Sequence, residues 1–303
     1  SPLQAVLINN QAFYIKRDDL ILGVLNGNKA RKLKFLFDDN HQYLQKIISY
    51  GGIQSNFMSA IAVLAKHKNW SCEYYTQPIP KYLKEKPVGN YAAAIKNNIK
   101  IIETTQAFAF ETIKAQYKNE KNVLVLDQGG RDHQAEIGLI ELCQELKEQA
   151  KQIDLDQYCV FMPSGTGTSA YFLQKHLYPI KVYTTPGVGS KTYLISQMNL
   201  IEGFDDKYIP KIIKTNRKYT FGQPYSNLLK LHQKLYIQTN IEFDLLYDPI
   251  GWMALFENID KISEPIIYIH CGGIEGNESM LNRYQYLKRK NKLKSYPTTS
   301  FDE

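Results

Sequence analysis

Short apolar runs alternate with amphipathic stretches along most of the 303-residue chain, and no other feature constrains the fold as strongly. The runs have the length of buried strands, and the stretches between them have the helical period. This order predicts an α/β fold of open, twisted, mostly parallel sheets with helices on both faces. The expected strands are residues 47–50, 72–76, 100–103, 123–126, 159–162, 182–184, 243–247 and 266–269. The expected helices are residues 54–66, 91–97, 169–176, a segment near Leu194, 225–238 and 278–290.

Length and composition limit the class of protein. A chain of 303 residues is long for one core and predicts two domains or one large unit, with candidate boundaries at residues 126–130 and 31–43. No run of eighteen apolar residues and no signal peptide is visible, so we expect a cytoplasmic protein that does not enter a membrane. The four cysteines are far apart in sequence and predict neither a disulfide framework nor a metal site.

The net charge of +7 raises the question of nucleic-acid binding. Most lysines are spread along helix-like segments beside acidic residues, and a basic cluster occurs only at residues 288–294. Such a cluster is more typical of a solvated helix face. We therefore expect a small-molecule substrate and no nucleic-acid partner.

Ligands of parallel sheets bind in the turns that follow the strands. Residues 163–169 (Pro-Ser-Gly-Thr-Gly-Thr-Ser) follow an expected strand and open an expected helix. Glycines let backbone amides converge, the helix start adds partial positive charge, and the hydroxyls add donors. We interpret this turn as a phosphate site rather than a plain connection, although it is neither a Walker A motif nor a dinucleotide fingerprint.

Other turns carry polar residues whose function is open from the residues alone. At residues 26–36 a helix begins with Gly27 before Lys29. Lys29 would then reach a cleft, while Lys32 and Lys34 fall on other faces of the helix. The alternative is a basic helix start that lies in solvent.

Residues 50–56 would bind a carboxylate or merely cap a helix. Asp248 would open a turn before Pro249. His270 and Cys271 would be buried structural residues, with no partner in metal-ligand spacing.

Two segments together resemble the signatures of one family. Lys-Arg-Asp-Asp-Leu at 16–20 and Gly-Asn-Lys-Ala-Arg-Lys-Leu at 27–33 are similar to motifs of the aminocyclopropane-carboxylate deaminase and D-cysteine desulfhydrase family. This family belongs to the tryptophan-synthase-β-like, fold-type-II class of pyridoxal-phosphate enzymes. Further similar segments follow in the family's order, at residues 51–56, 128–130, 247–248 and 270–273.

The resemblance implies roles for particular residues. Lys29 would form the Schiff base with pyridoxal 5'-phosphate, and its freed amine would move protons. Tyr247 would reach the substrate as acid, base or nucleophile. Asn56 would bind the ring hydroxyl, and Asp248 would face the pyridine nitrogen. The implied substrate-binding residues are Gln54, Ser55 and Asn56. The implied cofactor-binding residues are Lys29, Asn56, Ser164, Gly165, Thr166, Gly167, Thr168, Asp248 and Cys271.

The resemblance also implies an architecture and an activity. A large domain of residues 1–34 plus 127–303 would bind the cofactor, a small domain of residues 35–126 would close over the substrate, and the protein would be a homodimer. The implied reaction is elimination from D-cysteine or a similar amino acid, giving a keto acid, ammonia and sulfide. Ring opening and deamination of aminocyclopropane-carboxylate is the alternative, which an aspartate beside Tyr247 favours.

Two hypotheses from other classes stay open at this point. Pro249, Ile250 and Cys271 stand where the family has other residues, which would suit a binding or regulatory protein that lost turnover. A nucleotide-dependent enzyme would use the turn at residues 164–169, but it would leave the Lys29 segment unexplained.

Overall fold

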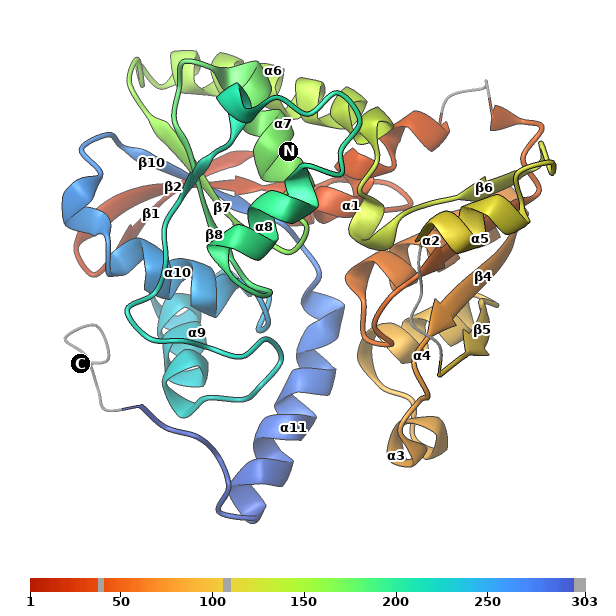
Figure 1. The fold of residues 1–303 in the computed structure, drawn as a ribbon. Coiled ribbons are helices and arrows are strands. Elements are labelled where there is room, and N and C mark those ends of the chain that lie inside the picture. The colour runs from red at the N-terminus through yellow and green to blue at the C-terminus, as the bar shows by residue number, and fades with distance from the viewer. Residues whose placement is uncertain (38–40, 106–109, 297–303) are drawn as a thin grey trace.

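The chain folds around two sheets with helices packed against them, and Figure 1 shows the smaller sheet to one side of the larger. This computed structural model describes residues 1–37, 41–105 and 110–296. The α/β class expected from the sequence, with open and mostly parallel sheets, is confirmed. The predicted domain ranges include residues 38–40, 106–109 and 297–303, which lie outside the described residues.

The larger sheet has the strand order β1-β2-β10-β7-β8-β9. All neighbouring pairs are parallel except β1 and β2, which form an antiparallel hairpin. The bounds are β1 (Leu3–Ile8), β2 (Gln11–Arg17), β7 (Cys159–Ser164), β8 (Val182–Pro186), β9 (Lys211–Ile212) and β10 (Ile266–His270).

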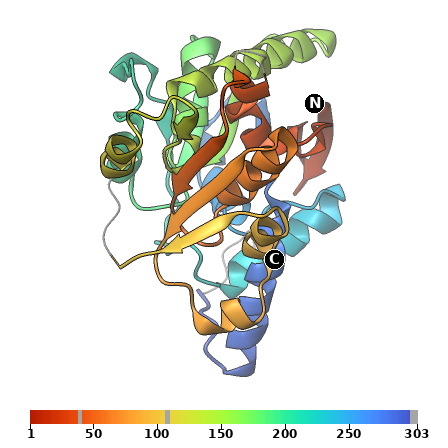
Figure 2. The same cartoon turned by 90° about the vertical axis from the view of Figure 1, so that its right-hand side faces the viewer.

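The smaller sheet is fully parallel, with the strand order β5-β4-β3-β6. Its strands are β3 (Lys46–Tyr50), β4 (Ser71–Thr76), β5 (Lys100–Glu103) and β6 (Val123–Val125). The chain leaves the larger sheet after β2, builds the smaller sheet and returns at β7. Figure 2 views the molecule from the side of the smaller sheet.

Helices cover both faces of the larger sheet because alternate strand residues point to opposite sides. Val160 and Met162 of β7 pack into one apolar cluster, which includes residues of α6 and α7. Cys159 and Phe161 pack into a second cluster, which includes residues of α9 and α10. The helices are α1 (Gly27–Lys32), α2 (Asn56–Lys68), α3 (Lys81–Glu85), α4 (Gly89–Lys96), α5 (Phe110–Gln116), α6 (Glu136–Gln152), α7 (Thr168–Leu177), α8 (Lys191–Met198), α9 (Ser226–Thr239), α10 (Asp248–Phe256) and α11 (Asn277–Arg289).

The predicted strand at residues 243–247 is wrong. This buried segment has no partner strand, because side chains satisfy its backbone amides. Asp248 accepts from the amide of Asp244, and Asn277 accepts from the amide of Leu245. Asp244 itself accepts from the amides of Leu246 and Tyr247. The alternation of apolar residues at 243–247 therefore results from burial and not from strand pairing.

The N-terminal hairpin was not anticipated from the sequence. Its turn residues Asn9 and Asn10 both have positive φ, at 52° and 62°. Asparagine tolerates this conformation, and two such residues form the two-residue turn that matches strand twist. The hairpin adds β2 to the edge of β10 and leads the chain toward α1.

A partly buried ion-pair network joins β2, α1 and α6. Glu145 of α6 accepts from Lys16 Nζ at 2.5 Å and from Arg31 Nη1 at 2.6 Å, and Arg31 also pairs with Asp18 at 2.9 Å. Burial by itself raises the pKa of Glu145, but the hydrogen bonds from Arg31 and Lys16 outweigh it and lower this pKa from 4.5 to about 2. The network holds α1, which carries Lys29, against the rest of the larger sheet.

We expect Glu145→Gln to lower the free energy of unfolding by about 1–2 kcal/mol at neutral pH, a modest loss because Glu145 is partly exposed. A carboxyl with a lowered pKa stabilises the fold above its unfolded pKa and loses this effect as pH falls from 4.5 toward about 2. The difference between the variant and the wild type should therefore shrink at pH values near about 3. Urea unfolding at neutral and acidic pH measures it. Glu141→Gln, on the exposed side of the same helix, is the control, and an equal effect of both changes would contradict the account.

Candidate active site

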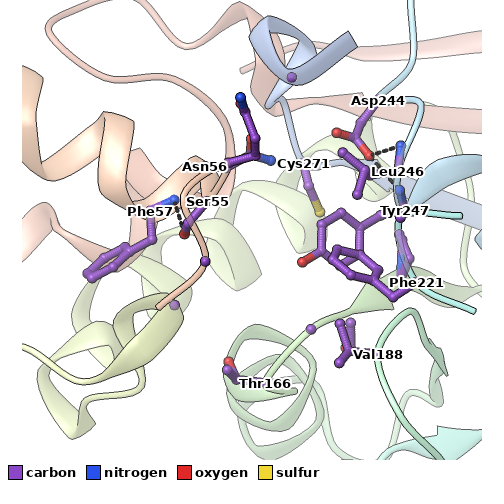
Figure 3. Close-up of a pocket in the computed structure, with 18 of the residues that line it drawn as sticks. Ser55, Asn56, Phe57, Thr166, Val188, Phe221, Asp244, Leu246, Tyr247 and Cys271 are labelled. Atoms are coloured by element: carbon purple, nitrogen blue, oxygen red, sulfur yellow. Dashed lines mark hydrogen bonds between the residues drawn. The ribbon is translucent and has the colours of Figure 1, made fainter. Parts of the chain in front are cut away.

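All of the site residues predicted from the sequence line one cavity of about 570 Å³ between the two sheets. They come from segments far apart in the sequence, namely the turns after β3 and β7, the start of α1, the start of α10 and the turn after β10. The residues brought together are Lys29, Gln54, Ser55, Asn56, Ser164, Gly165, Thr166, Gly167, Thr168, Tyr247, Asp248 and Cys271. Figure 3 shows Ser55 and Asn56 on one side of this cavity, with Tyr247 and Cys271 opposite them.

Lys29 lies in the first turn of α1, which is held tightly against the turn after β10. The amide of Asn28 donates to the carbonyl oxygen of Cys271 at 3.0 Å. Gly27 has φ +62°, and a Cβ atom there would lie 2.1 Å from that oxygen. Lys29 Nζ donates to Asn28 Oδ1 at 2.9 Å. Burial lowers the pKa of Lys29 and outweighs the opposite effect of Asp244, so more of the amine is unprotonated and able to act as a nucleophile or base than in a solvated lysine.

Lys32 corrects one sequence-based expectation. It was expected on another face of the helix, but it is buried and lines the same cavity as Lys29. Residues three apart share a helix face, so the spacing itself carried this signal. Lys32 Nζ donates to the carbonyl oxygen of Gly129 at 2.9 Å. Burial lowers its pKa well below the usual range, and the charge of Lys29 lowers it further. Lys34 is partly exposed and pairs with Glu141.

The turn between β7 and α7 has the form of an anion cup. Gly167 has φ +78°, and a Cβ atom there would lie 2.4 Å from Met198 Cε, so the turn requires glycine. Thr166 and Thr168 share a hydrogen bond between their hydroxyls at 3.0 Å, and Ser164 Oγ lies 2.7 Å from Thr184 Oγ1. The first turn of α7 presents backbone amides that have no partner within the helix.

Ser169 gives an independent sign that this turn binds a polar group. Its hydroxyl is buried and lines the cavity, yet it has no hydrogen-bond partner among the described residues. A buried hydroxyl without a partner is rare in proteins, and a phosphate oxygen would supply one. Gly129, whose carbonyl binds Lys32, is close to Thr166, since a Cβ atom at Gly129 would lie 3.1 Å from Thr166 Cγ2. The residues present therefore fit the phosphate of pyridoxal phosphate.

The loop before α2 forms the opposite wall. Ser55 caps α2, since its hydroxyl accepts from the amides of Phe57 and Met58. Gln54 donates to the carbonyl oxygen of Val88 at 3.0 Å and so connects this loop to α4. Asn56 Oδ1 accepts from Asn90 Nδ2 at 2.5 Å. The helix-capping interpretation of this segment is confirmed, and the segment also lines the cavity, while its binding of a carboxylate stays a prediction.

Tyr247 and Asp248 come from the start of α10. The ring of Tyr247 packs against the glycine turns, because a Cβ atom at Gly165 would lie 3.2 Å from its hydroxyl and one at Gly187 would lie 2.7 Å from Cδ1. Burial, with a smaller contribution from Asp244, raises the pKa of Tyr247, so its phenol stays protonated. Asp248 accepts from Tyr268 Oη at 2.6 Å and from the Asp244 amide at 2.9 Å. Burial and the charge of Asp244 raise the pKa of Asp248 well above its usual range.

Cys271 follows β10 and lines the cavity beside Lys29. Burial raises the pKa of its thiol well above the usual range, so the side chain stays neutral. Among residues 1–37, 41–105 and 110–296, no cluster of three or more His, Cys, Asp or Glu residues has an arrangement that would hold a metal ion. The same residues include no helix long and apolar enough to cross a membrane.

Known proteins similar to this chain were found by sequence and by structure, although no family model matches it. A putative 1-aminocyclopropane-1-carboxylate deaminase of Thermotoga maritima is 24% identical over 286 residues, covering 87% of this chain and 89% of the relative. A mitochondrial bifunctional D-cysteine desulfhydrase/1-aminocyclopropane-1-carboxylate deaminase of Arabidopsis thaliana is 25% identical, covering 89% of this chain and 74% of the relative. The D-cysteine desulfhydrase of Serratia proteamaculans is 23% identical, with 86% of each chain covered.

These relatives support the resemblance to the aminocyclopropane-carboxylate deaminase and D-cysteine desulfhydrase family that the sequence motifs indicated. Its members by name are enzymes, and the identities do not separate the two activities for this chain. The crystal structure of an aminocyclopropane-carboxylate deaminase homologue has a TM-score of 0.78 at 21% identity, covering 95% of this chain and 93% of the other. That of a pyridoxal 5'-phosphate-dependent aspartate racemase has a TM-score of 0.63 at 12% identity, covering 90% of each chain. Both structures share the fold of this chain.

Proposed function

We propose that the chain is a pyridoxal-phosphate enzyme that eliminates sulfide from D-cysteine or a closely related small amino acid. The observation that carries this proposal is Lys29, a lysine with a lowered pKa in a cavity that also holds a glycine- and hydroxyl-rich anion cup. When bound, pyridoxal phosphate supplies an electron sink for the amino acid. The overall change takes D-cysteine and water to a keto acid, ammonia and sulfide.

The residues of the chain divide the remaining work. The turn at residues 164–169 would hold the phosphate group, with Lys32 close by as a hydrogen-bond donor. Asn56 would bind the ring hydroxyl, and Asp248 would face the ring nitrogen. The loop of Gln54 and Ser55 would receive the substrate carboxylate, since the start of α2 favours an anion. Lys29, once released by the substrate amine, would move the proton at the α-carbon.

Tyr247 favours the desulfhydrase over the deaminase. A leaving thiolate needs a proton, and a buried neutral phenol is suited to donate one. Opening a cyclopropane ring by nucleophilic attack would instead require the phenolate, which the raised pKa of Tyr247 disfavours. Asp248 beside Tyr247 keeps the aminocyclopropane-carboxylate deaminase as the second candidate, because the resemblance links an acidic residue at this position with that activity.

The test is a product assay on the cofactor-loaded protein with three separate substrates. We expect sulfide and keto acid in equal amounts from D-cysteine, and much less from L-cysteine. If the protein forms keto acid from aminocyclopropane-carboxylate but no sulfide from D-cysteine, the deaminase replaces the desulfhydrase as the proposed activity. If covalently bound cofactor is present but no amino acid reacts, the chain is a binding or regulatory protein of the same fold.

A further inference from the structure

Asp244 has one oxygen engaged by the fold and one that faces the cavity. Its Oδ1 accepts from the backbone amides of Leu246 at 2.8 Å and Tyr247 at 2.5 Å. The residue is only 2% exposed, and Oδ2 has no hydrogen-bond partner among the described residues. Figure 3 shows the two bonds on one side of the carboxylate and the other oxygen on the side of Asn56. Because buried carboxylate oxygens are rarely unpaired, a ligand atom in the cavity would supply the missing partner.

The surroundings of Asp244 indicate which ligand atoms it would meet. Asn56, whose Oδ1 accepts from Asn90, directs its NH₂ group toward Asp244, and this interaction opposes the rise that burial causes in the pKa of Asp244. No hydrogen bond of regular geometry joins Asn56 to Oδ2. The charge of Asp244 in turn raises the pKa of Lys29. Asp244 therefore lies close to the two residues expected to hold the ring hydroxyl and the cofactor-linked nitrogen.

We propose that Asp244 is a further catalytic residue of this site, whose Oδ2, beside Asn56 and Lys29, would face the bound cofactor and would stabilise the proton on the nitrogen of Lys29. This inference rests on the proposed function, because it requires pyridoxal phosphate on Lys29. The backbone amides fix Oδ1, so Oδ2 cannot rotate away from the cavity without losing both bonds. The helix start that carries Tyr247 and the carboxylate that faces the cofactor are thus positioned by the same side chain.

The test compares Asp244→Asn with the wild type by following the visible absorption band of the cofactor-loaded protein against pH. Asparagine keeps an oxygen for the amides of Leu246 and Tyr247 but carries no charge. Loss of the negative charge destabilises the protonated nitrogen at Lys29. The pH at which the absorbance change is half complete, called the midpoint here, should therefore fall by about one pH unit. The other titratable groups facing this position stay in place in the variant: Asp248, Lys29, Tyr247, Tyr268 and Cys271.

Asp132→Asn is the matched control. Asp132 also accepts from a backbone amide two residues ahead, that of Gln134 at 2.8 Å, but it does not line the cavity. We expect no shift of the midpoint in this variant. Asp244→Ser, whose hydroxyl also accepts from nearby amides, should shift the midpoint in the same direction and replaces Asp244→Asn if that variant unfolds.

A second measurement separates this inference from the proposed function. The pKa of the Lys29 amine in the chain without added cofactor is obtained from the pH dependence of its acylation, mapped by mass spectrometry. It should be lower in Asp244→Asn than in the wild type. An unchanged band midpoint, with the cofactor attached to Lys29, would overturn the role of Asp244 alone. A wild type that never takes up the cofactor would remove the proposed function, and an unchanged Lys29 pKa would then remove this inference as well.

Discussion

Replacing Lys29 by alanine is expected to abolish covalent cofactor attachment and to lower kcat by about 10³-fold or more, the scale seen when a group that acts as both nucleophile and proton carrier is removed. The physical reason is that, among the described residues, only Lys29 and Lys32 combine a lowered pKa with a place in the cavity. Lys32 is also in the cavity but is bound to Gly129. The measurement is steady-state turnover together with the visible absorption of the protein.

The fold should survive this change. Burying the Lys29 amine costs free energy, as its lowered pKa indicates, so its removal is expected to alter the free energy of unfolding by less than about 1 kcal/mol. Lys34→Ala on the neighbouring exposed turn is the control and should retain activity and cofactor. Normal turnover by the Lys29 variant would refute its assignment as the reacting lysine.

The second large effect is expected for Gly27→Ala. The new Cβ would lie 2.1 Å from the carbonyl oxygen and 2.8 Å from the carbonyl carbon of Cys271, and neither backbone atom can move aside as a flexible side chain would. The positive φ of +62° adds strain for alanine. We expect a loss of about 3 kcal/mol or more in the free energy of unfolding, measured in urea. Displacement of α1 should also weaken cofactor binding, since Lys29 follows two residues later.

Gly203→Ala separates the cost of the close contact with Cys271 from the cost of a positive φ. Gly203 has a similar φ of +74° but has open space where a Cβ atom would be. Its replacement should cost only the left-handed penalty, about 1–2 kcal/mol. If Gly27→Ala costs no more than Gly203→Ala, then the close approach of α1 to Cys271 has no energetic weight, and the proposed tight placement of Lys29 is wrong.

Local sequence patterns predicted the elements that depend on local physics. The strands β3 to β8 and β10 and the helices α2, α4, α7, α8, α9 and α11 were predicted, because apolar periodicity and segment length determine them. The segment at residues 243–247 failed, because its alternation comes from burial while the side chains of Asp244, Asp248 and Asn277 satisfy its amides. No local pattern reports that kind of partner, which is supplied by residues up to 32 positions away.

The candidate site was likewise predicted in part from the sequence and in part visible only in the structure. The glycine- and hydroxyl-rich turn was recognisable because its residue types are typical of phosphate binding. The Lys29 segment was recognisable because it resembles a family motif. Lys32 was missed as a cavity residue, although helical spacing carried the signal for it. Asp244 was missed because its role depends on Oδ1 being held by the amides of Leu246 and Tyr247, a geometry visible only in the folded chain.

The account depends above all on where the cofactor attaches. Borohydride reduction of the protein after incubation with pyridoxal phosphate, followed by proteolysis and mass spectrometry, identifies the labelled lysine. The account predicts stoichiometric label on Lys29, loss of the visible band on reduction, and no label on the buried neighbour Lys32. Label on Lys32 or on exposed lysines alone, or no label at all, would contradict it.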